Sequence, residues 1–123
     1  MNIQQLYEFC LSKKGVTEHF PFDEDTLVFK VGGKMFALTS LKQFEARNPS
    51  INLKCNPEKA IELRAEYEAI RPGWHMSKTH WNTIDFNKDA SDKLIVKLIN
   101  HSYELVFNSL TKKQQAEILQ QKN

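Results

Sequence analysis

The chain has 123 residues, of which 41% are hydrophobic and 26% charged. This length suits one compact domain with a real core, and the composition is ordinary for a globular chain, with no apolar run near the ~20 residues of a membrane span. The formal net charge of +2 is too small to indicate a class of partner.

The first segment is predicted to be a helix. Hydrophobic residues recur at helical spacing from about residue 3 to residue 13, and Gly15 follows as a stop. The segment has neither a basic start nor a long apolar stretch, so we expect no secretory signal. Cys10 and Cys55 are isolated and lack metal-ligand spacing, so we expect buried or idle thiols in a reducing cytoplasm.

A polar loop leads to a predicted β-hairpin. Residues 26–31 have the composition of a strand, two glycines at 32 and 33 supply the turn, and a second strand starts at Lys34. We expect the hairpin to close at Val31 and Lys34. Phe29 then lies opposite Phe36 and Leu27 opposite Leu38, with all four on the core face and Val28, Lys30, Met35 and Ala37 on the other.

A second polar loop precedes a short strand at residues 51–55, in which Asn52 and Lys54 face away from the core. Asn56 as N-cap and Pro57 at the first helical position then predict a helix that ends near residue 70, before Pro72. We expect its buried side to contain Ala60, Ile61, Leu63 and Tyr67.

The remaining chain completes an α+β pattern. Residues 71–86 are predicted to form a second hairpin, with its turn near 77–79 and "HWNTIDF" as the return strand. A long helix is expected from residue 91 or 92 to about 110, and Thr111 caps a short final helix. The order of elements predicts a single domain over residues 1–123, an antiparallel sheet with helices packed on one face.

The alternation places one tryptophan on the outward face of the sheet. Ile84 faces the core, so Asn82 and His80 share that side, while Trp81 and Thr83 face away. Lys30, Asn52 and Lys54 of the neighbouring strands are expected on the same outward face. Lysines beside a tryptophan are typical of a nucleic-acid surface and equally of a protein-interaction face.

Basic residues also gather in the strand regions. Residues 26–57 contain five lysines or arginines and a single acid, Glu45, and residues 69–84 contain two basic residues and no acid. These charges are either ordinary solvated charges or a basic surface built from strands.

Each residue of the segment "RPGWHMSKTHWNT" at 71–83 also has a purely structural interpretation. The two tryptophans can be packing anchors, and Arg71 can cap the carbonyl end of the preceding helix. Lys78 near a turn can simply be solvated. His75 and His80 have no third ligand in sight and fall short of a metal site.

Catalytic patterns are weak. Ser77 lies near histidines without a nucleophile-elbow motif, and Cys55 precedes a helix N-terminus that could lower its pKa. A small apolar residue in the core is the simpler interpretation of Cys55. We therefore expect no enzyme, no metal and no cofactor.

The stretch "HMSKTHWNTI" resembles the H-L-N-K-x-H-W segment of the MmcQ/YjbR family of small bacterial proteins. The upstream "NLKCNPEKAIELRAEYEAIRPGW" is similar to that family's strand, proline-capped helix and R-P-G turn, and the match spans nearly the whole chain. Met76 and Ser77 stand where the family usually has Leu and Asn. The lost Asn removes an amide that could read a base edge.

The resemblance implies a frataxin-like (CyaY-like) α+β fold and DNA binding through a double-wing arrangement of hairpins. Combined with the residue pattern, it predicts a cytoplasmic monomer that binds double-stranded DNA weakly and without catalysis. The alternative is a protein-interaction or small-ligand domain that uses the same sheet face. The predicted DNA contacts are Lys30, Lys34, Lys54, Arg71 and Lys78 to phosphates, Trp81 and Trp74 to sugar or base, and His75 as a pH-dependent positive charge.

Overall fold

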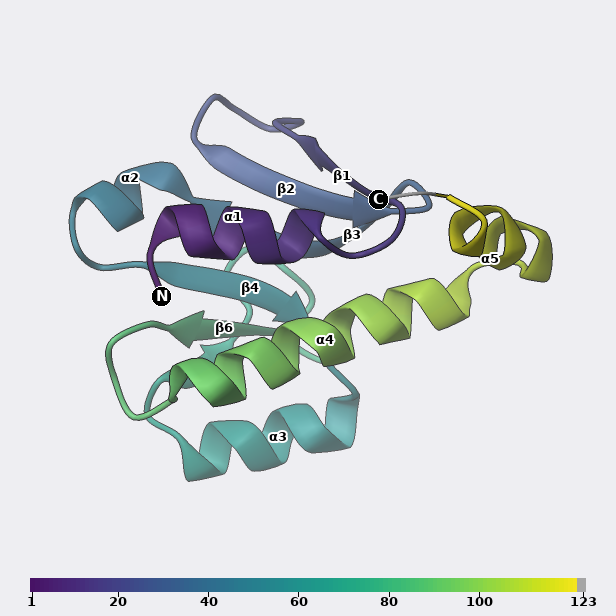
Figure 1. The fold of residues 1–123 in the computed structure, drawn as a ribbon. Coiled ribbons are helices and arrows are strands. Elements are labelled where there is room, and N and C mark those ends of the chain that lie inside the picture. The colour runs from purple at the N-terminus through teal and green to yellow at the C-terminus, as the bar shows by residue number, and fades with distance from the viewer. Residues whose placement is uncertain (122–123) are drawn as a thin grey trace.

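The structure of the protein is a computed structural model that describes residues 1–121. It is a six-stranded antiparallel sheet with helices on one face (Figure 1). This confirms the predicted α+β class. The strands follow the order β1-β2-β3-β4-β6-β5 across the sheet. They are β1 (Val16–His19), β2 (Thr26–Val31), β3 (Lys34–Ser40), β4 (Ser50–Lys54), β5 (Ile70–Pro72) and β6 (Trp81–Asp85). The helices are α1 (Ile3–Leu11), α2 (Leu41–Glu45), α3 (Pro57–Glu66), α4 (Asp92–Ser109) and α5 (Lys112–Leu119).

Side chains cap the N-termini of α3, α4 and α5. The side chains of Asn56, Ser91 and Thr111 accept hydrogen bonds from backbone N–H groups in the first turns of α3, α4 and α5. The helix predicted to end near residue 70 stops earlier, because Tyr67 is already extended and Ile70 pairs with β6. Ile61 was expected on the buried side of α3, but its side chain is exposed.

The core lies between the sheet and the helices. The inner face of the sheet, which is the face covered by α1, α3 and α4, buries Phe29, Ile51 and Leu53 among apolar helix residues. Within α4, the Ser102 hydroxyl donates to the Phe36 carbonyl at 2.5 Å and accepts from the Lys54 N–H at 2.9 Å. Ser102 thereby ties α4 to two neighbouring strands.

A β-bulge changes the register predicted for the β2–β3 hairpin. The hairpin closes at Val31 and Lys34 as expected, but Phe29 pairs with Ala37 and Leu27 with Thr39. Phe36 is the extra residue of the bulge, so every later residue of β3 changes face. The predicted pairs Phe29–Phe36 and Leu27–Leu38 are therefore wrong. Ala37, predicted to face outward, packs in the main core, and Leu38, predicted to face the core, lies on the outer face.

Two elements were not predicted. Strand β1 lies at the edge of the sheet with three of its four residues exposed, so it lacks the alternation that marks a half-buried strand. Helix α2 has five residues, too few for a periodic pattern, and its N-cap is Ser40, whose side chain accepts the Gln43 N–H. In the described part of the chain, no helix is both long and apolar enough to cross a membrane.

Both cysteines are free and buried, as expected. Burial raises the pKa of the Cys10 thiol to about 12. Burial also raises the pKa of Cys55, despite its position just before α3. Both shifts favour the neutral thiol over the thiolate.

Candidate functional site

An eight-residue segment folds over the outer face of the sheet and connects the two antiparallel strands of the predicted second hairpin. This covering segment, Gly73–His80, connects the three-residue strand β5 to β6. The Gly73 N–H donates to the Trp81 carbonyl at 2.9 Å, and the Trp74 N–H donates to the Thr83 hydroxyl at 3.0 Å. Gly73 has no room for a side chain, because an added Cβ would lie 2.7 Å from the Trp81 Cβ.

Trp81 lies on the outer face, opposite Lys54, as the alternation predicted. It is nevertheless only 8% exposed, because Met76 of the covering segment packs against it together with Val28 and Leu38. The predicted exposed aromatic at Trp81 is therefore wrong, and its structural interpretation as a packing anchor holds.

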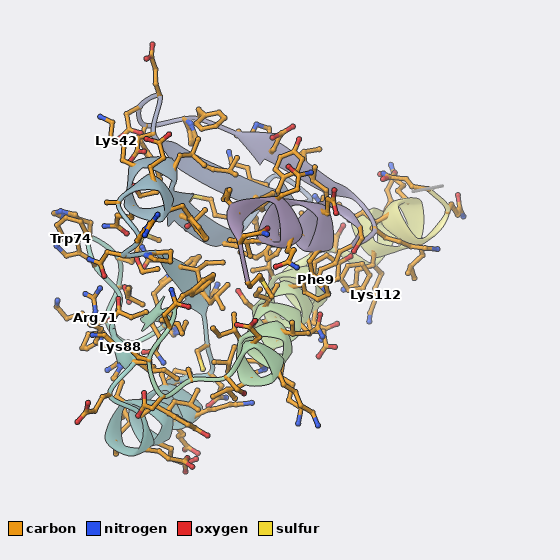
Figure 2. All side chains as sticks on the ribbon, turned by 60° about the vertical axis from the view of Figure 1, so that its left-hand side comes forward. Phe9, Lys42, Arg71, Trp74, Lys88 and Lys112 are labelled. Carbon is orange, nitrogen blue, oxygen red and sulfur yellow. The ribbon has the colours of Figure 1, made fainter. Side chains whose placement is uncertain are left out.

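Trp74 is the exposed tryptophan. Its side chain is 60% exposed and lies on the side of the molecule opposite α1 and α4, together with Arg71 (Figure 2). Its ring lies against His75, with the ring centroids 4.4 Å apart and the planes tilted by 35°. The two rings form one wall above the outer face.

Arg71 does not cap a helix. Its Nε and one terminal nitrogen each donate to the Asp85 carboxylate at 2.9 Å. This bidentate pair lowers the pKa of Asp85, and burial acts in the opposite direction. The Lys88 ammonium lies 3.5 Å from the same carboxylate, so two cations share one buried acid.

The other predicted phosphate contacts lie on β2, β3 and β4 and in the covering segment. Lys30 and Lys54 are partly buried on β2 and β4, Lys34 is exposed beside the β2–β3 turn, and Lys78 is exposed in the covering segment. The Lys78 carbonyl accepts a hydrogen bond from Arg64. The strand register places Lys30, Lys34 and Lys54 toward the same end of the sheet, the end that carries the β2–β3 turn.

His80 was predicted to face the core, but its side chain is exposed, because β6 begins one residue later. Its carbonyl accepts the Cys55 N–H at 2.7 Å. Asn82 does lie on the core side, where it accepts from Arg64 Nε at 2.6 Å. Across residues 1–121, no three histidine, cysteine or carboxylate side chains are grouped to hold a metal ion.

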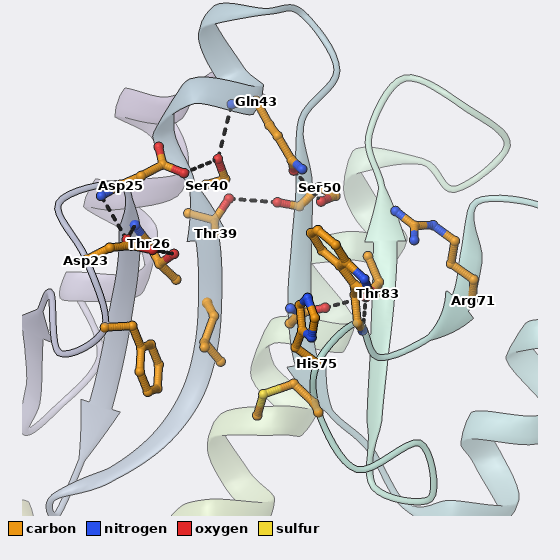
Figure 3. Close-up of a pocket in the computed structure, with 15 residues that line it drawn as sticks. Asp23, Asp25, Thr26, Thr39, Ser40, Gln43, Ser50, Arg71, His75 and Thr83 are labelled. Carbon is orange, nitrogen blue, oxygen red and sulfur yellow. Dashed lines mark hydrogen bonds between the residues drawn. The ribbon is translucent and has the colours of Figure 1, made fainter.

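A cleft of about 520 Å³ opens on the outer face, between the covering segment and the loop that precedes β2 (Figure 3). We call it the outer-face cleft. Strands β2, β3, β4 and β6 contribute its floor. Its lining residues are Phe22, Asp23, Asp25, Thr26, Leu38, Thr39, Ser40, Gln43, Ser50, Asn52, Arg71, Trp74, His75, Met76 and Thr83.

One side of the outer-face cleft is acidic. Asp23 accepts the N–H groups of Thr26 at 2.6 Å and Asp25 at 2.9 Å, and these bonds hold its pKa below the usual value. Asp25 accepts the Lys42 N–H at 2.7 Å and the Ser40 hydroxyl at 2.6 Å. These bonds fix both carboxylates in the loop before β2.

The floor of the cleft is polar toward β4 and β6. The Thr83 hydroxyl donates to the Asn52 amide oxygen, so the amide nitrogen of Asn52 is the group left to donate. The Thr39 hydroxyl donates to the Ser50 carbonyl at 2.7 Å, and the Ser50 hydroxyl donates to the Gln43 side chain at 2.8 Å. This network holds the polar floor in one arrangement.

His75 has a left-handed backbone conformation, with φ of 59°. This conformation costs an L-residue roughly 1–2 kcal/mol, and such residues cluster at functional sites. Packing of Met76 and the hydrogen bond from the Trp74 N–H hold the turn on both sides of His75. The strained backbone therefore places the His75 ring at the cleft.

Sequence reasoning missed the acidic side of the outer-face cleft. The loop at residues 20–25 was predicted to be polar and its acids were given no binding role, whereas Phe20 and Phe22 within it are exposed in the structure. Two phenylalanines in an acidic loop were the available signal. His75, Trp74 and Arg71 were predicted to act together, and all three line the cleft.

Comparison with known proteins identifies the family of this chain. The model of the YjbR family matches residues 11–105. The chain belongs to the YjbR family. This confirms the resemblance found from the sequence.

Two relatives from Escherichia coli match over most of the chain. "Uncharacterized protein YbdF" of Escherichia coli O157:H7 is 40% identical over 100 residues, which is 80% of this chain and 79% of that protein. "Uncharacterized protein YjbR" of Escherichia coli strain K12 is 31% identical over 120 residues, 98% of this chain and 99% of that protein.

Solved structures similar to this YjbR-family chain share its fold. Protein DR2400 of Deinococcus radiodurans, a DUF419 domain, superimposes with a TM-score of 0.88 at 35% identity, over 95% of this chain and 87% of that one. A protein of Pseudomonas syringae superimposes with a TM-score of 0.72 at 27% identity, over 86% of this chain and 99% of that one. The frataxin-like description stays a prediction.

Proposed function

We propose that this YjbR-family protein binds a small molecule in the outer-face cleft and does so without catalysis. The single observation that carries the proposal is the cleft of about 520 Å³, with exposed Trp74 lying against His75, whose backbone is left-handed. Small-molecule sites have volumes of roughly 300–1,000 Å³ and combine apolar walls with a few fixed polar groups.

The charges around the outer-face cleft favour a small ligand over DNA at this cleft. The outer face carries Asp23, Asp25 and Asp85 among its basic residues, and Arg71 is already paired with Asp85. A phosphate backbone needs several uncompensated cations along a track. A small ligand needs only a few convergent groups, which the cleft supplies.

A fragment panel tests the proposal. Small aromatic, aliphatic, cationic, anionic and zwitterionic compounds are added to the protein, and the change in tryptophan fluorescence is followed. We expect at least one compound to give saturable quenching in the wild-type protein and no matching signal in Trp74→Ala. A matched control, Phe20→Ala, changes an exposed aromatic that does not line the outer-face cleft and keeps the signal. Absence of any saturable response across the panel would contradict the proposal.

DNA binding through the hairpins is the second proposal. It is supported by exposed Trp74 beside His75, with Lys78 exposed in the same segment. An exposed ring can stack on a base, and the ammonium group neutralises a phosphate. The double-wing arrangement implied by the family resemblance belongs to this proposal.

Fluorescence anisotropy with labelled double-stranded DNA tests the second proposal. DNA binding predicts affinity that falls steeply with added salt and falls on every sequence alike in the double variant Lys54→Ala/Lys78→Ala. No binding at low salt and high protein concentration would exclude it. A small molecule that competes with DNA would place both ligands on the same face.

A further inference from the structure

The carboxylates that line the outer-face cleft lie on one side of it. Figure 3 shows Asp23 and Asp25 together on that side and Arg71 on the far side. Arg71 is already paired with the Asp85 carboxylate, so the far side offers a ligand little net positive charge. Within residues 1–121, no salt bridge is formed by Asp23 or Asp25. The side of the cleft at these two residues is therefore negatively charged.

Asp25 is the carboxylate with capacity to bind a ligand. Its oxygens accept one hydrogen bond each, from the Lys42 N–H and the Ser40 hydroxyl, whereas a carboxylate has about four acceptor positions. The N–H groups of Thr26 and Asp25 hold the pKa of Asp23 below its usual value, and the charge of Lys42 contributes less. One lysine does not cancel two carboxylates, so a cationic group can be bound at Asp25.

An apolar floor lies close to Asp25. The Asp25 carboxylate is hydrogen-bonded to Ser40, and Leu38 precedes Ser40 by two residues on β3 and belongs to the outer cluster. Two residues of a strand span about 6.7 Å. A two-carbon chain followed by a phenyl ring covers such a distance. A ligand bound at Asp25 therefore reaches Leu38 without extending across β4 and β6 toward Arg71.

Two exposed rings in the lining favour a flat apolar group on this floor. Phe22 is 62% exposed and Trp74 is 60% exposed, and Met76 packs beside Leu38. An aryl group over Leu38 and Met76 would remove apolar area from water and offer a neighbouring ring a surface to stack on. The volume of the cleft and its exposed rings indicate that a ligand binds, and the two carboxylates determine the charge of that ligand.

We propose that the ligand is a small organic cation with a flat apolar body, of the class of arylalkylamines. Its ammonium group donates to the Asp25 carboxylate, with the charge of Asp23 beside it, and its aryl group lies over Leu38 and Met76. This inference rests on the proposed small-molecule function and names the ligand class.

Calorimetric titration of the wild-type protein with three compounds of nearly equal size tests the ligand class. Phenethylamine is a cation, 2-phenylethanol is neutral and 3-phenylpropionate is an anion. We expect phenethylamine to bind with a Kd on the order of 0.1–1 mM, as suits a ligand of its size in an open cleft. 2-Phenylethanol should bind about tenfold more weakly, because a neutral hydrogen bond replaces a charge-assisted one. 3-Phenylpropionate should bind more weakly still, because the carboxylates repel it.

The variant Asp25→Asn tests the contact that selects the cation. It keeps the size of the side chain and one acceptor oxygen, and removes the charge that faces the ammonium group. We expect about tenfold weaker binding of phenethylamine and nearly unchanged binding of 2-phenylethanol. The unchanged alcohol shows that the cleft is intact. Glu24→Gln is the matched control: it removes a charge in the same loop from a residue that does not line the cleft, and should leave both affinities nearly unchanged.

The compounds and the variants together decide the ligand class. The expected order of affinities, with a loss confined to phenethylamine in Asp25→Asn, supports the organic cation. Binding of the alcohol or the anion as tight as that of phenethylamine overturns the cation and leaves the small-molecule function standing. An equal loss of phenethylamine affinity in Glu24→Gln overturns the direct contact with Asp25. Failure of all three compounds to bind, while another fragment of the panel quenches Trp74, overturns the arylalkylamine class alone. Silence toward every compound overturns both proposals. The order of affinities is measured on the wild-type protein, so it holds even where a variant does not fold.

Discussion

The two faces of the sheet differ in what covers them. The inner face is closed by α1, α3 and α4 and buries one large cluster, whereas the outer face is covered only in part, by the covering segment. The outer cluster contains three buried residues, Val28, Leu38 and Trp81. The inner face holds the larger core, and the outer face leaves a cleft lined by polar groups and exposed rings, where we propose that a ligand binds.

Paired leucine variants give the largest effect and test this division. Leu53→Ala on the inner face should lower the free energy of unfolding by about 4 kcal/mol, because the large cluster cannot collapse around the cavity. Leu38→Ala, on the neighbouring strand but facing the cleft, should cost about 2 kcal/mol, because water and the Met76 side chain can fill the space. Urea unfolding of both variants measures the difference. Equal losses would mean that the outer cluster is as essential to the fold as the inner one.

Gly73→Ala tests whether the covering segment is fixed to the outer face. The added Cβ would lie 2.7 Å from the Trp81 Cβ and 3.0 Å from the Trp81 carbonyl oxygen, so the segment has to move. We expect urea unfolding to show a free energy of unfolding lower by about 2 kcal/mol. We also expect a change in the tryptophan emission spectrum, to which Trp74 contributes. In the control Gly33→Ala no atom opposes the added Cβ, and only the left-handed φ of 79° acts against it. A wild-type emission spectrum in Gly73→Ala would show that the segment does not depend on this contact.

Arg71→Ala tests the ion pair beside the cleft through its dependence on pH. Arg71 lowers the folded-state pKa of Asp85 below the unfolded value of about 4, so the pair stabilises the fold above that pH. Its contribution is lost as the pH falls through the folded-state pKa. We expect the free energy of unfolding of the variant to be about 1 kcal/mol below that of wild type at pH 7. The value is small because Arg71 is half exposed. The difference between variant and wild type should disappear toward pH 2. A gap that does not change with pH would point to packing instead.

Trp74→Ala should have the smallest effect on stability. The side chain is 60% exposed, so the free energy of unfolding should change by less than about 0.5 kcal/mol. Binding of any ligand in the outer-face cleft should weaken in the same variant, because a wall is lost. Thermal unfolding measures the change in stability, and ligand titration of the same sample measures the change in affinity. A loss of stability similar to that of Leu38→Ala would make Trp74 a structural residue.

The sequence predicted the inner face better than the outer face. Ile51 and Leu53 alternate with polar residues, and the start of α3 is marked by Asn56 and Pro57, so local patterns were sufficient there. The bulge at Phe36 has no such signal. It follows from the fit of Phe36 and Ala37 into one core, which depends on helices distant in the chain.

Only the part of the site that is local in sequence was predicted. Trp74, His75 and Arg71 were singled out because they are close in sequence. Their partners across the cleft, Asp23 and Asp25, come from a loop about fifty residues away, and only the strand order β2-β3-β4-β6 brings the two groups to one face. A single-sequence pattern does not contain that order.

Nuclear magnetic resonance mapping of a bound ligand on the ¹⁵N-labelled protein tests the central claim most directly. The compound from the fragment panel that binds best is titrated, and chemical-shift changes are placed on the structure. If the ligand binds in the outer-face cleft, we expect saturable shifts at the indole N–H of Trp74 and at the backbone of Asp25, Asn52 and His75, with the helix-covered face unchanged. Shifts confined to the helices, or scattered without saturation, would contradict it.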